Sequence, residues 1–283
     1  MEWSASDAAL VRQLADRWEP LRTERQADLT IHIEATALSG EDHRRSLEPV
    51  TMLPSPDGGS SVRIRFGTLA DVEWQVASHR MVCGYDATSF PRSAGGFLEI
   101  VFCWLARAWL TRQGRLVLHA AAILTGGAAD LFTGPSGVGK TTLTDSVAAE
   151  RVLHDDVVVL SQRDGSWWVT AGPHPHHGQW IHQAGRHWPV GRIFLLQREG
   201  ASGVERMPGH QALARLFREG LYGFADAAGL YQQRLALLGA VVERHPCYRL
   251  RYRLHHESPW EFIASTSPSR AHPIAAGFSP QEV

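Results

Sequence analysis

The sequence predicts an α/β fold with a β-rich N-terminal region, and three observations support this prediction. A glycine-rich segment, residues 134–141 (GPSGVGKT), lies between an apolar strand-like run and a helix-like run. A later run, residues 151–160 (RVLHDDVVVL), reads as a returning strand and completes the order strand, loop, helix, strand. In roughly the first ninety residues, apolar and polar residues instead alternate in short segments, as they do in half-buried strands.

The spacing of apolar residues predicts the elements in the N-terminal part of the chain. Residues 1–20 carry apolar side chains at helical spacing and predict an opening helix. Residues 28–36 (DLTIHIEAT), 61–66 (SVRIRF) and 71–77 (DVEWQVA) predict strands. Residues 97–112 (FLEIVFCWLARAWLTR) are strongly apolar with three charged interruptions, a pattern that suits a helix packed between layers.

In the second part of the chain, apolar runs between turn residues predict the elements. Residues 115–124 (RLVLHAAAIL) and 128–133 (AADLFT) read as strands separated by a Gly-Gly turn, and the second runs directly into the glycine-rich segment. The predicted helices cover 141–149, 210–223 and 226–242. The remaining predicted strands cover 151–160, 166–170, 191–196 and 248–254.

Composition limits the classes of partner. The 283 residues have a formal net charge of -1, so there is no global basic field, and we expect no nucleic-acid partner. No apolar run reaches the roughly 18 residues that a membrane helix needs and no signal-peptide core is present, so we expect a cytoplasmic protein without a membrane partner. Cys83, Cys103 and Cys247 are odd in number and form no CxxC pair, which favours reduced, buried thiols over a disulfide framework or a zinc site.

The segment 134–141 has the spacing of a phosphate-binding loop, GxxxxGK[ST]. Gly134, Gly137 and Gly139 let the backbone turn its amides inward around phosphate oxygens, and the following helix adds its positive end. Lys140 can reach the β- and γ-phosphates, and the hydroxyl of Thr141 can hold magnesium. The segment therefore predicts a site for a nucleoside triphosphate with Mg²⁺, the alternative being a purely structural glycine turn. The predicted nucleotide-binding residues are Gly134, Pro135, Ser136, Gly137, Val138, Gly139, Lys140, Thr141 and Thr142.

An acidic pair, Asp155 and Asp156, lies on the predicted returning strand, where it would be presented near the phosphates. Paired carboxylates there can divide two tasks: one helps to hold magnesium, and the other takes a proton from an attacking hydroxyl. The alternative is a solvated strand end. His119 lies among small residues on an earlier predicted strand and by itself reads as a hydrogen-bonded core histidine.

The three segments LHAAAI, GPSGVGKT and HDDVVVL occur in this order, and residues 116–160 thereby resemble the HPr kinase/phosphorylases and their relatives. In that family a histidine precedes the phosphate loop by one strand pair, and an Asp-Asp pair follows on the next strand. The resemblance implies the α/β nucleotide-binding core shared by HPr kinases and phosphoenolpyruvate carboxykinases. It also implies a homo-oligomer, because HPr kinases are hexamers.

Carried over position by position, the resemblance assigns a role to each candidate residue. Lys140 becomes the phosphate-binding lysine, and Thr141 becomes the magnesium ligand in place of the family's usual serine. Asp156 becomes the general base, His119 its support, and Asp155 a neighbour near the metal.

The resemblance fades after residue 160. HPr kinases carry a Glu-Ile-Arg-Gly stretch after the acidic pair, which supplies a metal-binding glutamate and a catalytic arginine, whereas this chain has residues 172–178 (GPHPHHG) in its place. This departure argues against phosphorolysis and against HPr as the substrate. The chain is more similar to divergent HPr-kinase-related proteins, some of which phosphorylate precursor peptides of natural products such as lasso peptides.

A histidine-rich tract follows, and its members are His174, His176, His177, His182 and His187. The tract could hold a metal, but Pro173 and Pro175 favour an extended loop that faces the substrate or the phosphates. Arg186 and Arg192 could lend positive charge to the transferring phosphoryl group.

Together these residues predict an ATP- and magnesium-dependent kinase that transfers the γ-phosphoryl group to a serine hydroxyl of a peptide or protein. Two alternatives stay open: an ATP-binding regulatory or assembly module without hydroxyl phosphorylation, and a small-molecule kinase of the same fold. We expect a β-rich region for the substrate or partner over 1–95, the catalytic domain over 96–268 and a flexible tail over 269–283.

Overall fold

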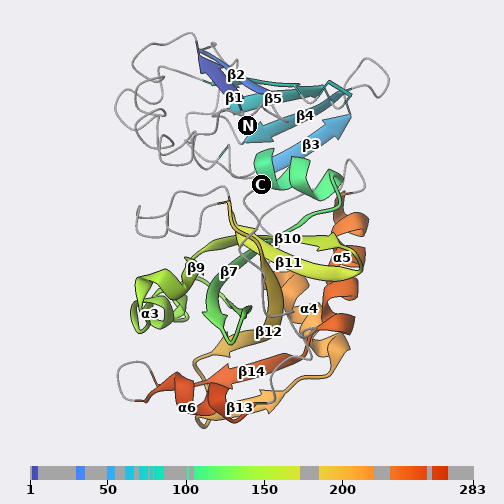
Figure 1. Ribbon diagram of the computed structural model, residues 1–283. Helices are drawn as coiled ribbons and strands as arrows, with labels where there is room; N and C mark the ends of the chain where they lie inside the picture. Colours follow the sequence, from blue (N-terminus) through green and yellow to red (C-terminus); the bar gives the residue numbers. More distant parts are fainter. Residues whose placement is uncertain are drawn as a thin grey trace. The chain divides into compact units, whose positions relative to one another are not determined.

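The computed structural model is a mixed α/β protein, as the sequence predicts (Figure 1). It describes residues 2–5, 30–35, 50–54, 61–66, 70–75, 77–78, 80–85, 101, 105–172, 185–219, 230–253 and 257–266. The chain divides into two compact units, with the main division between Leu105 and Ala106. The predicted boundary at residues 95 and 96 and the predicted tail 269–283 lie outside the described residues. None of the helices among the described residues has the length and apolar character needed to cross a membrane.

The first unit contains a six-stranded sheet with the strand order β1-β2-β6-β5-β4-β3. Its strands are β1 (Glu2–Ala5), β2 (Thr30–Ala35), β3 (Val50–Pro54), β4 (Ser61–Phe66), β5 (Ala70–Gln75) and β6 (Arg80–Tyr85). The alternating segments are confirmed as β2, β4 and β5, and Ile31, Val72 and Trp74 are among their buried side chains. The opening helix is wrong over β1, where parallel pairing with β2 overrides the helical spacing; residues 6–20 are not described.

The second unit contains an eight-stranded sheet. Seven of its strands follow the order β11-β10-β7-β8-β12-β14-β13, and the eighth, β9, pairs with β7. Its strands are β7 (Leu116–Thr125), β8 (Ala128–Thr133), β9 (Val152–His154), β10 (Val157–Arg163), β11 (Ser166–Ala171), β12 (Trp188–Gln197), β13 (Gly203–Arg206) and β14 (Cys247–Arg251). β11 also pairs with β12, which closes the ring β11-β10-β7-β8-β12. Within the sheet, β8, β12 and β14 run parallel to one another.

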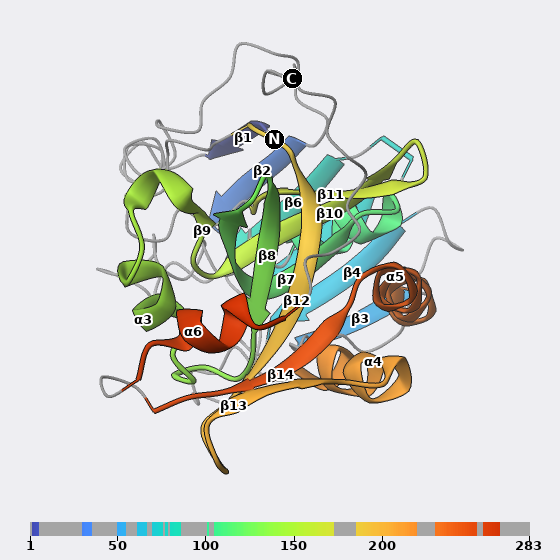
Figure 2. The same ribbon diagram turned by 60° about the horizontal axis from the view of Figure 1, so that its bottom comes forward.

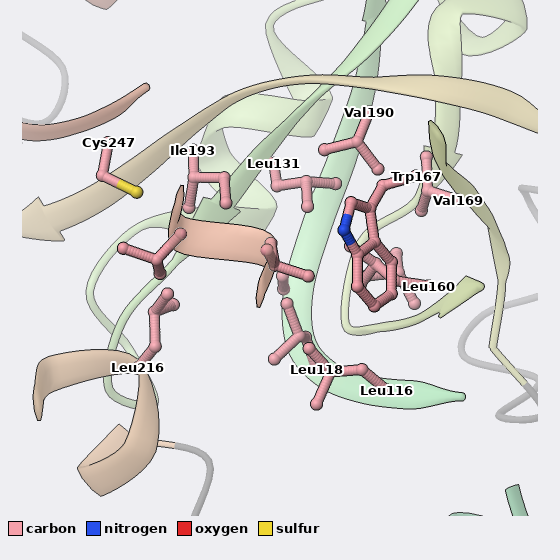
Figure 3. Close-up of a cluster of buried hydrophobic side chains, with 14 of the residues drawn as sticks. Leu116, Leu118, Leu131, Leu160, Trp167, Val169, Val190, Ile193, Leu216 and Cys247 are labelled. Carbon is pink, nitrogen blue, oxygen red and sulfur yellow. The ribbon is translucent and has the colours of Figure 1, made fainter. Parts of the chain in front are cut away.

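Helices cover both faces of this sheet (Figure 2). They are α3 (Lys140–Asp145), α4 (Gly209–Glu219), α5 (Leu230–Arg244) and α6 (Pro259–Ala264), in addition to the helical residues 105–112 and the 3-10 turn η2 (Ala149–Arg151). Successive strand residues point to opposite faces. Leu118 and Leu131 therefore share a core with α4 and α5, part of which Figure 3 shows, whereas Ala121 and Phe132 share one with α3 and α6.

The helix after the glycine-rich loop is shorter than predicted. The sequence predicts a helix over 141–149, but α3 ends at Asp145 and is followed by a turn. Three threonines among its six residues lower its helix propensity. The hydroxyl of Ser146 donates a hydrogen bond of 2.7 Å to Leu143 O, which satisfies a carbonyl at the helix end. The positive end predicted for this helix therefore comes from fewer than two turns.

The described cysteines are free and buried, as predicted. Burial raises the pKa of the Cys83 and Cys247 thiols to about 12, so both stay protonated at neutral pH. Cys103 lies outside the described residues.

Candidate functional site

The glycine-rich loop lies at the carboxyl end of β8, where a buried strand turns directly into α3. Gly139 is the N-cap of α3 and has a φ of 116°, a value that L side chains rarely adopt. A Cβ on Gly134 would lie 3.0 Å from Val138 Cγ1 and 3.2 Å from Leu196 O, which is too close for an unstrained contact. Glycine is thus required where the loop touches β12 and where it enters the helix.

Lys140 and Thr141 differ in their surroundings. Lys140 is buried, and its Nζ donates a hydrogen bond of 2.9 Å to Gly134 O, so the ammonium group lies over the loop itself. Thr141 is exposed at the start of α3, where its hydroxyl can reach a ligand. This is the arrangement in which a lysine and a hydroxyl can bind phosphate oxygens and a magnesium ion.

Two side chains support the loop from neighbouring strands, and neither was picked out from the sequence. Tyr252 follows β14 and donates a hydrogen bond of 3.2 Å from its hydroxyl to Gly139 O. Burial raises the Tyr252 pKa to about 12, with a smaller opposing influence from the Arg198 charge, so this donor keeps its proton at neutral pH. Arg198 follows β12 and donates to Gly137 O. No sequence signal marks them, because the parallel placement of β8, β12 and β14 brings them to the loop.

The acidic pair lies at an interruption between β9 and β10, whereas the sequence predicts one continuous strand over 151–160. The two residues that flank the interruption share one register against β7, with His154 opposite Ala122 and Val157 opposite His119, whereas the register shifts within β9 between Val152 and His154. Asp155 and Asp156 between them leave the ladder. The interruption is stabilised by His154, whose Nδ1 accepts hydrogen bonds of 3.0 Å from the amides of both Asp156 and Val157.

The structure brings His119 and Asp156 into contact. His119 Nε2 lies 2.8 Å from Asp156 Oδ1. The Asp156 side chain is 28% exposed, but that of His119 is only 11% exposed. A carboxylate that is reachable from solvent and oriented by an imidazole behind it can accept a proton from a substrate hydroxyl. Taken alone in the sequence, His119 reads as a core histidine, whereas the resemblance implies that it supports Asp156; the structure places the two side chains in contact.

Asp155 is buried, with 3% of its surface exposed, and its Oδ1 has no hydrogen-bond donor among the described residues. His154 Nδ1 lies 3.7 Å from this oxygen, but Nδ1 already accepts two hydrogen bonds and so carries no proton to offer. A buried carboxylate oxygen without a donor suits a cation. No group of three or more metal-binding side chains occurs in the described part of the chain, whereas Mg²⁺ needs only one or two carboxylates beside substrate phosphates.

The loop and the acidic pair lie on the two sides of β7. Thr133, the residue before the loop, pairs with Ala120, and Val157, the residue after the acidic pair, pairs with His119. The Thr133 hydroxyl also donates a hydrogen bond of 3.1 Å to His119 O. Two strand spacings separate the two segments, roughly 10 Å between backbones. A phosphate group bound by the loop and an acceptor hydroxyl can both fit across this span.

Arg192 does not lend its charge to a phosphoryl group, as the sequence had suggested, because it is engaged elsewhere. Its guanidinium forms an ion pair with Asp130, with Nη2 2.5 Å from Oδ2, and both side chains are largely buried. Its Nη1 donates to Ile263 O at 3.1 Å and to Thr266 Oγ1 at 2.6 Å, at the end of α6. All its nitrogens are thus engaged in joining β8, β12 and α6, so this charge is structural.

Most of the histidine-rich tract is not described, including His174, His176, His177 and His182. The exception is His187, whose Nε2 lies 3.1 Å from Arg163 Nη2. Burial lowers the His187 pKa, and the charges of Arg163 and Arg115 lower it further. A neutral imidazole is therefore favoured there. Arg186 is half-buried.

No known protein family and no curated protein sequence matches this chain. Among solved structures, the HPr(Ser) kinase/phosphatase from Coxiella burnetii is similar over 49% of this chain and 86% of its own length, at 11% sequence identity and a TM-score of 0.28. What the site can do therefore follows from its own residues.

Proposed function

We propose that this protein is an ATP- and magnesium-dependent kinase that transfers the γ-phosphoryl group to a serine hydroxyl of a peptide or protein, such as a precursor peptide of a natural product. The observation that carries this proposal is the 2.8 Å contact of His119 Nε2 with Asp156 Oδ1, across β7 from the glycine-rich loop. A phosphate-binding loop alone would suit any nucleotide-binding protein. An oriented, accessible carboxylate beside it suits the transfer of the phosphoryl group to a hydroxyl.

In this proposal each residue has one task. The loop amides and Lys140 bind the phosphates. Thr141 and Asp155 would hold Mg²⁺, which neutralises charge on the phosphates when bound. Asp156 accepts the proton of the serine hydroxyl as its oxygen attacks the γ-phosphorus, the bond from that phosphorus to the bridging oxygen breaks, and ADP leaves. His119 holds Asp156 in place through Nε2.

The test is incubation of the full chain with ATP, MgCl₂ and the peptide encoded beside its gene. We expect the peptide to gain the mass of one phosphate, and we expect a variant peptide with alanine at the acceptor serine to gain none. ATP binding without any transfer would contradict the proposal and favour the regulatory module. Transfer to a metabolite but not to peptides would instead favour the small-molecule kinase.

Arg198 provides a further prediction for nucleotide binding. Its guanidinium contacts the loop carbonyl of Gly137, and among the described residues no carboxylate forms an ion pair with it. Arg198→Met should therefore weaken ATP binding roughly tenfold, because the charge-assisted hydrogen bond that holds the loop at Gly137 is lost. Isothermal titration calorimetry measures the change. Arg251→Met is the matched control, since Arg251 ends the neighbouring β14 and contacts Glu205 Oε2 at 3.4 Å instead; equal effects of the two variants would refute a special role for Arg198.

A further inference from the structure

His154 lies inside the site, but the proposed reaction gives it no task. It ends β9, it is 5% exposed, and its Nδ1 accepts the amide hydrogens of Asp156 and Val157 at 3.0 Å each. Because Nδ1 acts as an acceptor in both bonds, the ring is neutral with its proton on Nε2. The imidazole therefore acts as a fixed acceptor for main-chain groups.

These two hydrogen bonds replace part of a strand ladder. The residues at 154 and 157 keep one common register against β7, so nothing in the register requires an interruption between them. A continuous strand would point Asp155 and Asp156 to opposite faces of the sheet. With the imidazole as acceptor, the two amides are satisfied away from the ladder, and the chain can bend at both acidic residues.

We infer that His154 is a positioning residue that holds the acidic pair out of the ladder. Through the amides of Asp156 and Val157 it sets the main chain that aims Asp156 at His119 and leaves Asp155 Oδ1 without a protein donor. This inference rests on the proposed function, because it assigns His154 an effect on the phosphoryl-transfer step. It requires no change in the charge of His154.

Two substitutions separate this role from simple packing. His154→Leu keeps much of the volume but removes the acceptor. His154→Asn keeps a hydrogen-bond acceptor, because its amide oxygen takes the position of Nδ1. We expect the leucine variant to lower kcat on the order of 10²-fold with little change in KM for ATP, since a small misplacement of a reacting group has an effect of this size. The asparagine variant should recover most of kcat.

The effect should also depend on Asp156. In single-turnover measurements, His154→Leu should slow transfer further by less than about twofold in an Asp156→Asn background, because both changes disable the same step. The control is His245→Leu, which removes a half-buried histidine that also has a main-chain contact, 3.1 Å from Nδ1 to Gly191 O. It should leave kcat unchanged. Normal kcat in His154→Leu, no recovery in His154→Asn, or an equal effect in the Asp156→Asn background would overturn the inference.

Hydrogen exchange distinguishes this inference from the proposed function. If the wild-type chain transfers no phosphate, the proposed function fails, but the amides of Asp156 and Val157 can still be measured. His154→Leu should speed their exchange at least tenfold, since protection follows from their hydrogen bonds, and His154→Asn should not. Unchanged exchange in the leucine variant would overturn the positioning role whatever the activity.

Discussion

Asp156→Asn is expected to lower the rate of phosphoryl transfer by about 10² to 10⁴-fold, the usual contribution of a general base. Asparagine keeps the size of the side chain and an oxygen for the contact with His119 Nε2, but it cannot take up the proton of an attacking hydroxyl. ATP affinity should stay within about twofold, because the change falls on the reaction step. Single-turnover phosphorylation and a separate ATP titration measure the two quantities.

The control for this variant is Asp164→Asn. Asp164 is exposed in the turn between β10 and β11 and has a φ of 50°, which asparagine tolerates. This control should match the wild type in both measurements. Full activity of Asp156→Asn would exclude Asp156 as the base. A parallel loss of ATP affinity would instead show that Asp156 acts in nucleotide or metal binding.

Asp130→Ala is expected to lower the free energy of unfolding by about 3 to 5 kcal/mol, because it leaves a buried arginine without its partner. Asp130 is 2% exposed and accepts hydrogen bonds from the Arg192 guanidinium, from the Arg192 amide at 2.8 Å and from the Thr125 hydroxyl at 2.6 Å. Arg192 in turn holds the end of α6 through Thr266. Urea unfolding followed by circular dichroism measures the loss.

Two further variants test the cause of this loss. Asp130→Ala combined with Arg192→Met should recover part of the stability, since no buried charge then remains unpaired. Asp71→Ala removes the partner of Arg65, an ion pair of 2.9 Å in which the arginine is 49% exposed, and should cost at most about 1 kcal/mol. A loss for Asp130→Ala no larger than that for Asp71→Ala would contradict a structural role for the buried pair.

Local patterns predicted the elements of this protein well. The alternation in β2, β4 and β5 and the apolar runs of β7 and β8 identified strands, because side-chain burial imposes a period of two on a half-buried strand. The opening helix and the length of the helix after the loop were wrong. In the first case, strand pairing with β2 decided the conformation. In the second, threonines and the Ser146 contact ended α3 early.

In the candidate site, too, residues that are close in sequence were predictable, whereas contacts between distant residues were not. The glycine spacing, Lys140 and Thr141 are close in sequence, so their local geometry follows from the motif and from the strand and helix beside it. The hypothesis for Arg192 failed because a sequence does not show which carboxylate faces an arginine. Asp130 lies 62 positions away and reaches Arg192 only because β8 and β12 are neighbours.

The sequence by itself determined the order of a strand, a glycine loop, a helix and an acidic pair, since each depends on residues that are near one another in the chain. Only the tertiary structure decided that His119 meets Asp156, that His154 interrupts the strand at the acidic pair, and that Arg198 and Tyr252 support the loop. These contacts depend on strand order and register. Both are set by burial across the whole sheet, which no short segment encodes.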